Sequence, residues 1–186
     1  MPPNDRNLIL LRTAEIDRVA VMIRDPRDAL VSWWRHLERD NIKDTPWIVA
    51  HLYASGLMSE RYYSLPMEAR FLDLIEHMFP LMQWWVSRWL AAIERPPSGI
   101  GFHLLRYEDF VADTRGSLRS LYRFFGHEVE PILPQKEGPP ERMQAGIHTA
   151  THFRRGVPGS HRDEVPAAHV ALLNERVDQA LFERCG

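Results

Sequence analysis

The chain has one cysteine, Cys185, among its 186 residues, so no disulfide can form within it. Small secreted domains usually depend on disulfides, whereas proteins of reducing compartments keep their thiols free. The first ten residues, MPPNDRNLIL, also lack the basic-then-apolar pattern of a secretion signal. These absences predict a soluble protein of the cytoplasm.

Long apolar runs and an excess of positive charge are absent as well. The richest apolar stretch, MFPLMQWWVSRWLAAI, is interrupted by Gln83, Ser87 and Arg88, whereas a membrane span needs about 18 apolar residues in succession. The chain holds 23 Lys and Arg against 25 Asp and Glu, and its net charge is -2. A general nucleic-acid-binding protein would show a broad basic excess. We therefore expect neither a membrane nor a nucleic acid as partner, and any anion-binding site must be local.

The order of sequence patterns predicts one α/β domain over residues 1–186, with a parallel sheet flanked by helices. Residues 19–24, VAVMIR, are apolar and β-branched, as in a buried parallel strand. Asp25 suits the N-cap, and Pro26 the first position, of a helix that continues to about Arg39. The chain is therefore expected to pass directly from a strand end into a helix.

The rest of the chain alternates between helical periodicity and loop composition. Apolar residues recur every three or four positions from 67 to 95, and Pro80 is expected to divide or kink that helix. Residues 41–66 are aromatic-rich and only weakly periodic, which indicates a partly helical excursion. The other expected elements are a strand to Leu105, helices over 113–126 and 166–184, and loops over 128–146 and 151–166.

The turn RDPRDALVS, residues 24–32, is the first candidate for chemistry. A helix N-terminus presents free N–H groups and the positive end of the helix dipole, which together favour anions. Arg24 adds a planar fork of donors suited to phosphate, and Ser32 can add a hydroxyl from within the helix. A capped helix with Arg24 and Arg27 on its surface explains the same pattern, and the pattern alone does not separate the two interpretations.

Two later segments could complete an anion site. In LLRYEDF, Tyr107 follows a strand end and can present an aromatic hydroxyl. In HFRRGVPG, Arg154 and Arg155 precede Gly156, and a glycine lets backbone N–H groups approach an anion closely. Taken singly, these segments are also explained by a packing tyrosine beside a helix-capping acid and by an ordinary solvated loop.

Together, RDPRDALVS, RYEDF and FRRGVPG resemble, in type and order, the motifs of the sulfotransferase family, which uses 3′-phosphoadenosine 5′-phosphosulfate (PAPS). In that family a strand ends in Arg-x-Pro-x-Asp before a helix serine, a Tyr-Glu-Asp segment follows, and an Arg-Lys-Gly loop lies near the end. The resemblance covers about residues 18–186. It implies a fold related to P-loop nucleotide-binding folds, and transfer of a sulfuryl group from PAPS to a hydroxyl or amine of a small-molecule or glycan acceptor.

The resemblance also implies which residues bind the cofactor PAPS. These are Arg24, Ser32, Tyr107, Arg154, Arg155 and Gly156. The first two would hold the 3′-phosphate, the tyrosine would face the adenine, and the last three would close over the same phosphate. The sequence departs from the family pattern in two places. Arg155 stands where lysine is common, and SHRDE follows GVPG where the family often continues Asp-Trp-Lys-Asn.

The family's catalytic machinery is not recognisable in this sequence. The family has a loop of the Pro-Lys-Ser-Gly-Thr type that holds the 5′-phosphosulfate, but PPSGIG at 96–101 lacks the lysine and precedes a strand. The family's catalytic base usually lies upstream of the position of Arg24, where this chain has no histidine. Neither Glu15 nor Asp17 has a spacing that identifies it as the base. The sequence therefore predicts an N-terminally truncated domain whose catalytic residues are unknown.

Two other functions stay open at this point. One is a catalytically inactive module that binds PAPS or its product, adenosine 3′,5′-bisphosphate, and the other is a small kinase. The absence of Gly-x4-Gly-Lys-Ser/Thr counts against the kinase. The spacing of His148 and His152 suits two ligands of one metal, but no third ligand has motif spacing, so no metal site is predicted.

The acceptor and the oligomeric state cannot be read from the sequence. Variable acceptor contacts are expected in residues 41–66, because this excursion follows the candidate cofactor helix. Tryptophans could also line an acceptor pocket, although core packing explains most of them. The tryptophans in question are Trp33, Trp34, Trp84, Trp85 and Trp89. A homo-oligomer is compatible with the sequence.

Overall fold

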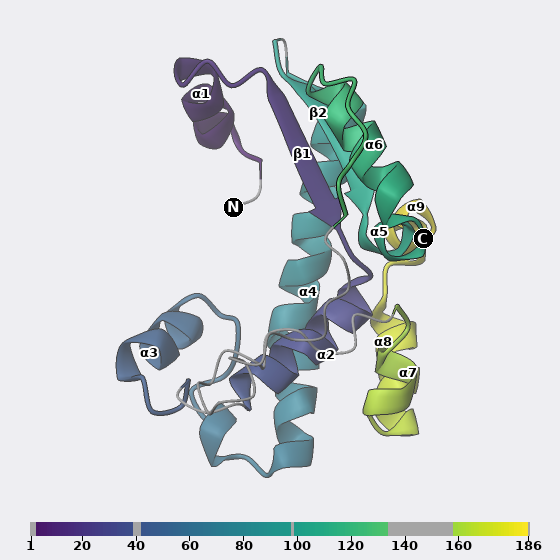
Figure 1. Cartoon of the computed structure of the whole chain (residues 1–186). Helices are drawn as coiled ribbons and strands as arrows, with labels where there is room; N and C mark the ends of the chain where they lie inside the picture. The colour runs from purple at the N-terminus through teal and green to yellow at the C-terminus, as the bar shows by residue number, and fades with distance from the viewer. Residues whose placement is uncertain (1–2, 39–41, 98, 134–157, 186) are drawn as a thin grey trace, which may run out of the picture.

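The computed structural model describes residues 3–38, 42–97, 99–133 and 158–185. Two parallel strands lie beside one long helix, α4, and the other helices are arranged along its length (Figure 1). The elements are α1 (Asp5–Thr13), β1 (Arg18–Ile23), α2 (Pro26–Leu37), α3 (Pro46–Ala54), the 3₁₀ turn η1 (Tyr62–Ser64), α4 (Met67–Glu94), β2 (Gly101–Arg106), α5 (Tyr107–Ala112), α6 (Thr114–Phe124), α7 (His161–Glu164), α8 (Ala167–Arg176) and α9 (Gln179–Cys185).

The strands β1 and β2 pair in parallel, with Arg18 opposite Gly101 at one end and Ile23 opposite Arg106 at the other. The carboxyl ends of both strands therefore lie at the same edge of the sheet. Because α2 follows β1 and α5 follows β2, the two helices begin side by side (Figure 1). The expected α/β architecture, with parallel strands and flanking helices, is confirmed.

One face of the sheet packs on the C-terminal half of α4. Successive residues of a strand face opposite sides, so Val21 and Ile23 of β1 are buried while Met22 between them is 44% exposed. The last helix, α9, closes this core with Leu181. The buried residues of the cluster are Val21, Ile23, Val86, Leu90 and Leu181.

The N-terminal half of α4 packs on α2 in a larger core. Phe71 of α4 lies at its centre, where its ring meets Trp34 of α2 edge to face, with the ring centroids 5.0 Å apart. Leu173 brings α8 into the same core, and Leu52 brings in α3. Segments that are far apart in the sequence are therefore held together by one apolar cluster.

Helix α4 runs unbroken from Met67 to Glu94, so of the two expected effects of Pro80, division and kinking, division is wrong. Proline removes one N–H donor and frees the carbonyl four residues before it. Pro80 is exposed, so water can bond that carbonyl, whereas Met78 and Phe79 beside it are buried in the core. Tertiary packing on one side of the helix outweighs the loss of a hydrogen bond on the other.

Further segments have secondary structure that the sequence patterns do not predict. The short apolar run at 7–12 lies within a helix, α1, whose N-cap Asn4 accepts a hydrogen bond from the N–H of Asn7 at 2.8 Å. The single helix expected over 166–184 is two helices, α8 and α9. The break falls at Asp178, whose N–H donates to Gln83 of α4 and whose carboxylate accepts from the N–H of Leu181, as a cap does.

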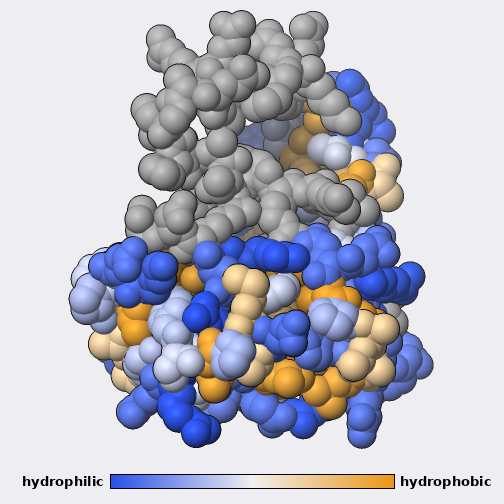
Figure 2. All heavy atoms as spheres, turned by 90° about the horizontal axis from the view of Figure 1, so that it is seen from below, coloured by the Kyte–Doolittle hydropathy of each residue, from blue (hydrophilic) through white to orange (hydrophobic). Residues whose placement is uncertain are grey.

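The helical end of the molecule is seen from below in Figure 2, where hydrophobic residues lie in small patches between hydrophilic ones. Within the described ranges, no helix combines the length and the apolar character that a membrane crossing requires.

Candidate functional site

Arg24 lies between the end of β1 and the start of α2, at the edge where both strands end. Its guanidinium carbon stands 4.7 Å from the centre of the Tyr107 ring, the first residue of α5, in a cation–π contact. The Nε atom of Arg24 is buried and has no hydrogen-bond partner among the described residues. The structure thus brings two of the candidate residues together and leaves a strong donor unsatisfied.

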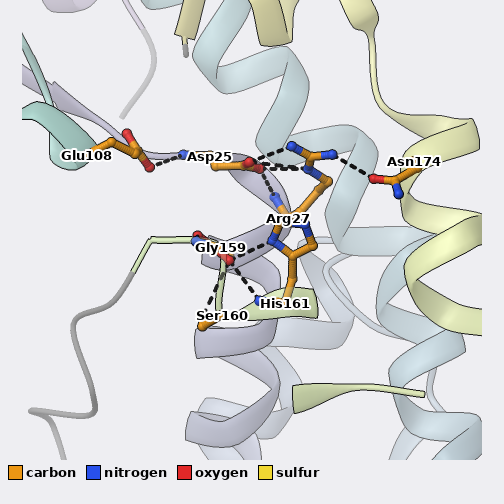
Figure 3. Close-up of polar contacts among 8 residues, drawn as sticks. Asp25, Arg27, Glu108, Gly159, Ser160, His161 and Asn174 are labelled. Atoms are coloured by element: carbon orange, nitrogen blue, oxygen red, sulfur yellow. Dashed lines mark hydrogen bonds and ion pairs between the residues drawn. The ribbon is translucent and has the colours of Figure 1, made fainter. Parts of the chain in front are cut away.

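The second arginine of the turn, Arg27, has a structural role. Its backbone N–H and its guanidinium both donate to the carboxylate of Asp25, the N-cap of α2, with an Nη2–Oδ2 distance of 2.8 Å. Its Nη1 donates to Oδ1 of Asn174 in α8 at 2.6 Å (Figure 3). Arg27 is buried and joined to these partners, so it is not the surface arginine of the alternative interpretation, and Arg24 remains the candidate for an anion.

Glu108 links the two helix starts. Its Oε1 accepts a hydrogen bond from the backbone N–H of Asp25 at 3.0 Å, so α5 is fastened to the N-terminus of α2 (Figure 3). Glu108 of RYEDF is therefore a helix-capping acid, as one interpretation of the sequence had it. The helix that it caps is α2, through Asp25, which lies 83 residues before Glu108 in the chain. This contact keeps Tyr107 beside Arg24.

Asp28, in the first turn of α2, is the most constrained acid of the site and was missed by sequence reasoning. Its side chain is fully buried, and it accepts hydrogen bonds from the N–H groups of Gly159 at 2.6 Å and His161 at 2.9 Å. Nδ1 of His161 lies 2.7 Å from the same carboxylate and must be the donor, because an ionised carboxylate only accepts. The hydroxyl of Ser160 donates at 3.3 Å.

These hydrogen bonds keep Asp28 ionised. Burial by itself raises the pKa of the Asp28 carboxyl, but the hydrogen bonds from His161 and Gly159 outweigh it and hold that pKa at about 2, below the ordinary 3.8. No feature of RDPRDALVS distinguishes this acid from a solvated one, since its partners come from the other end of the chain.

Because the pKa of Asp28 is lower in the folded protein, its ionisation stabilises the fold fully above pH 3.8 and loses that effect as the pH falls towards about 2. The expected loss is about 2 kcal/mol of unfolding free energy. Urea unfolding across this window should show a smaller pH dependence for Asp28→Asn than for wild type. Equal pH dependence of the two proteins would contradict the assignment.

The other candidates are placed only in part. Ser32 is exposed on α2, four residues after Asp28 and therefore on the same side of the helix. Arg154, Arg155 and Gly156 lie outside the described residues, as do His148 and His152. In the described part of the chain, no three His, Cys, Asp or Glu side chains gather as a metal site would need.

An apolar groove of about 470 Å³ opens beside Arg24, between the end of β1, the start of α2 and the middle of α4. Trp33, Trp84 and Trp85 line it, together with Met22. Leu57 contributes one contact from the 41–66 excursion. Trp84 is 51% exposed, whereas Trp34 is buried in the larger core. The tryptophans are therefore divided between the core and this groove.

Comparison with known proteins gives one match. The family model described as "Sulfotransferase domain" matches residues 16–183, which is nearly the whole chain. No curated protein and no solved structure matches.

Proposed function

Because the chain belongs to the sulfotransferase domain family, we propose that it transfers a sulfuryl group from PAPS to a hydroxyl or amine acceptor. The family match over residues 16–183 is the observation that carries this proposal. PAPS supplies the sulfuryl group when it is bound. The residues of this chain have to recognise its phosphates, hold its adenine and place the acceptor.

The edge of the sheet at which both strands end fits the 3′-phosphate of such a cofactor. In open parallel sheets, ligands bind outside the carboxyl ends of the strands, and helix N-termini there favour phosphate. The buried Nε–H of Arg24 lacks a hydrogen-bond acceptor among the described residues, and a phosphate oxygen would supply one. The contact of Arg24 with Tyr107 places an aromatic ring beside it, on which the adenine would pack.

Ser32 and the basic loop would complete this phosphate site. Ser32 stands further along α2 with its side chain exposed, so its hydroxyl is free of the core. Arg154, Arg155 and Gly156 precede Gly159, which is hydrogen-bonded to α2.

The groove beside Arg24 would take the acceptor. Its walls are apolar and carry three tryptophans, so they suit a small molecule with an aromatic or aliphatic body better than a glycan. Arg24 lines this groove and also contacts Tyr107. An acceptor in the groove would therefore bind at the same sheet edge as the proposed cofactor, whose sulfuryl group is carried by its 5′-phosphate.

Trp84→Ala should weaken the binding of 2-naphthol, a planar hydroxyl compound, by about 5- to 20-fold, because an aromatic contact and its buried area are lost. Titration calorimetry measures the change. Trp47→Ala is the matched control, since Trp47 is 74% exposed on α3 and does not line the groove. An equal effect of the two substitutions would contradict the assignment of the groove.

Transfer of ³⁵S-labelled sulfate from PAPS to 2-naphthol or to a set of small hydroxyl and amine compounds tests the proposed reaction. Labelled product that depends on the protein supports it. Binding of adenosine 3′,5′-bisphosphate without any transfer would show a cofactor-binding module instead of an enzyme. Neither binding nor transfer by the folded chain would overturn the proposal.

A further inference from the structure

Arg24 is the only charged residue among the described residues that line the apolar groove. The other lining side chains are aliphatic, aromatic or thioether groups of β1, α2, α4 and the segment before η1. The volume of about 470 Å³ lies in the range of pockets that bind small molecules. A ligand of this groove would therefore meet apolar groups over most of its surface and a positive charge at one place.

Arg24 forms no ion pair within the described part of the chain. The neighbouring acid Asp25 pairs with Arg27 at 2.8 Å, and Oε1 of Glu108 accepts a hydrogen bond from the backbone N–H of Asp25 (Figure 3). Arg24 itself contacts the face of the Tyr107 ring, 4.7 Å from its guanidinium carbon. A half-buried cation without a counter-ion favours an anion as its ligand, because the attraction is stronger there than in open water.

The walls of the groove leave a large apolar surface open to solvent. Met22, Trp33, Leu81 and Trp84 all line it, and each of them is at least 38% exposed. Single exposed apolar residues are common on protein surfaces, but a group of large ones around one groove indicates a binding site. These residues come from three elements, β1, α2 and α4, so the site is formed by the packing of the fold.

Charge and shape together restrict the class of ligand. An inorganic anion would pair with Arg24 but leave the apolar walls uncovered. A neutral apolar molecule would cover the walls but leave the cation without a partner, and a cationic molecule would be repelled. A molecule with an apolar body and one anionic group satisfies both parts of the site.

We propose that the groove and Arg24 form a binding site for an amphiphilic organic anion. The anionic group, a sulfate ester or a carboxylate, pairs with the guanidinium, whose planar fork of donors suits either one. The aromatic or aliphatic body lies against Trp33 and Trp84.

A consequence follows for the proposed reaction. Its product, a sulfate ester, is an amphiphilic anion, whereas the hydroxyl acceptor from which it forms is neutral. The product would therefore bind this groove more tightly than the acceptor and would compete with the 3′-phosphate of the cofactor for Arg24. This competition rests on the proposed function, whereas the binding of the anion does not.

Titration calorimetry with 2-naphthol, 2-naphthyl sulfate and 2-naphthoate tests the preference for an anion, because the three ligands share one body and differ in the group it carries. The wild type should bind at least one of the two anions at least tenfold more tightly than 2-naphthol. The tighter anion identifies the preferred group as a sulfate ester or a carboxylate. Equal or weaker binding of both anions would overturn the inference, and this comparison needs no variant.

Three substitutions show whether Arg24 is responsible. Arg24→Ala should weaken binding of the tighter anion at least tenfold and binding of 2-naphthol less than threefold. Trp84→Ala should weaken both ligands by the same factor, because both share the wall contact that it removes. Arg119→Ala is the matched control, since Arg119 pairs with Glu130 on the exposed surface, and it should change neither affinity. Equal losses of the anion and of 2-naphthol in the folded Arg24→Ala variant would contradict the assignment of Arg24.

Titration of 2-naphthyl sulfate into protein saturated with adenosine 3′,5′-bisphosphate tests the competition. The apparent affinity for the sulfate ester should fall at least tenfold, and that for 2-naphthol should change less than twofold. An unchanged affinity for the sulfate ester would overturn the competition at Arg24. If the folded wild type bound the anion but not the bisphosphate, the proposed function would fail and the anion site of the groove would stand.

Discussion

Replacing Arg24 by alanine is expected to weaken the binding of adenosine 3′,5′-bisphosphate by about 10- to 100-fold. Hydrogen bonds to charged groups contribute about 1.5–3 kcal/mol each, which corresponds to this range of dissociation constants. The guanidinium also has a buried Nε without a hydrogen-bond partner in the described structure and a cation–π contact with Tyr107, so it is held ready for an anion. Calorimetric titration of the two proteins measures the loss.

Two comparisons show whether the loss comes from phosphate recognition. Arg24→Lys keeps the charge but loses the planar fork, so its affinity should lie between those of the wild type and the alanine variant. Arg119→Ala removes an arginine whose guanidinium pairs with Glu130 on the exposed surface, and it should leave the affinity unchanged. If all three variants bound as the wild type does, Arg24 would not belong to a phosphate site.

Phe71→Ala is expected to lower the free energy of unfolding by about 3–5 kcal/mol, the range for large-to-small substitution of a buried aromatic residue. Phe71 has no exposed surface, and its ring contacts Trp34 of α2 and His169 of α8. The substitution therefore leaves a cavity where three helices meet. Urea unfolding measures the change.

The next residue of α4 provides the control for this substitution. Leu72 is 39% exposed. Leu72→Ala therefore removes an apolar side chain at nearly the same position along the helix, but from its partly exposed side. It should cost less than about 1 kcal/mol. A cost for Phe71→Ala as small as that of Leu72→Ala would contradict the position of Phe71 at the centre of the core.

The features that the sequence predicts well are local ones. Asp25 and Pro26 determine where α2 begins because an N-cap and a proline at the first helical position act within one turn. Arg24 and Tyr107 each follow directly after a strand. Because the two strands are parallel, both end at the same edge of the sheet, and the two residues come into contact there. Two of the three motifs that carry the family resemblance lie in these same segments.

The features that the sequence does not predict depend on tertiary contacts. The residues next to Arg27 in the sequence do not indicate its hydrogen bond to Asn174. Those next to Asp28 do not identify His161 as its partner. The continuation of α4 through Pro80 also depends on tertiary contacts, because the residues next to Pro80 pack in the core. The local rule for proline is correct about the lost hydrogen bond but says nothing about what compensates for it.

Helix α4 has 28 residues and is therefore about 42 Å long at 1.5 Å per residue, and it contributes to both apolar cores. Because fraying the helix at one end removes part of the support on which the other core packs, we expect the opening of the two cores to be thermodynamically coupled. The sheet edge that carries Arg24 is linked to the larger core in two ways, through α4 and through α2, which begins two residues after it.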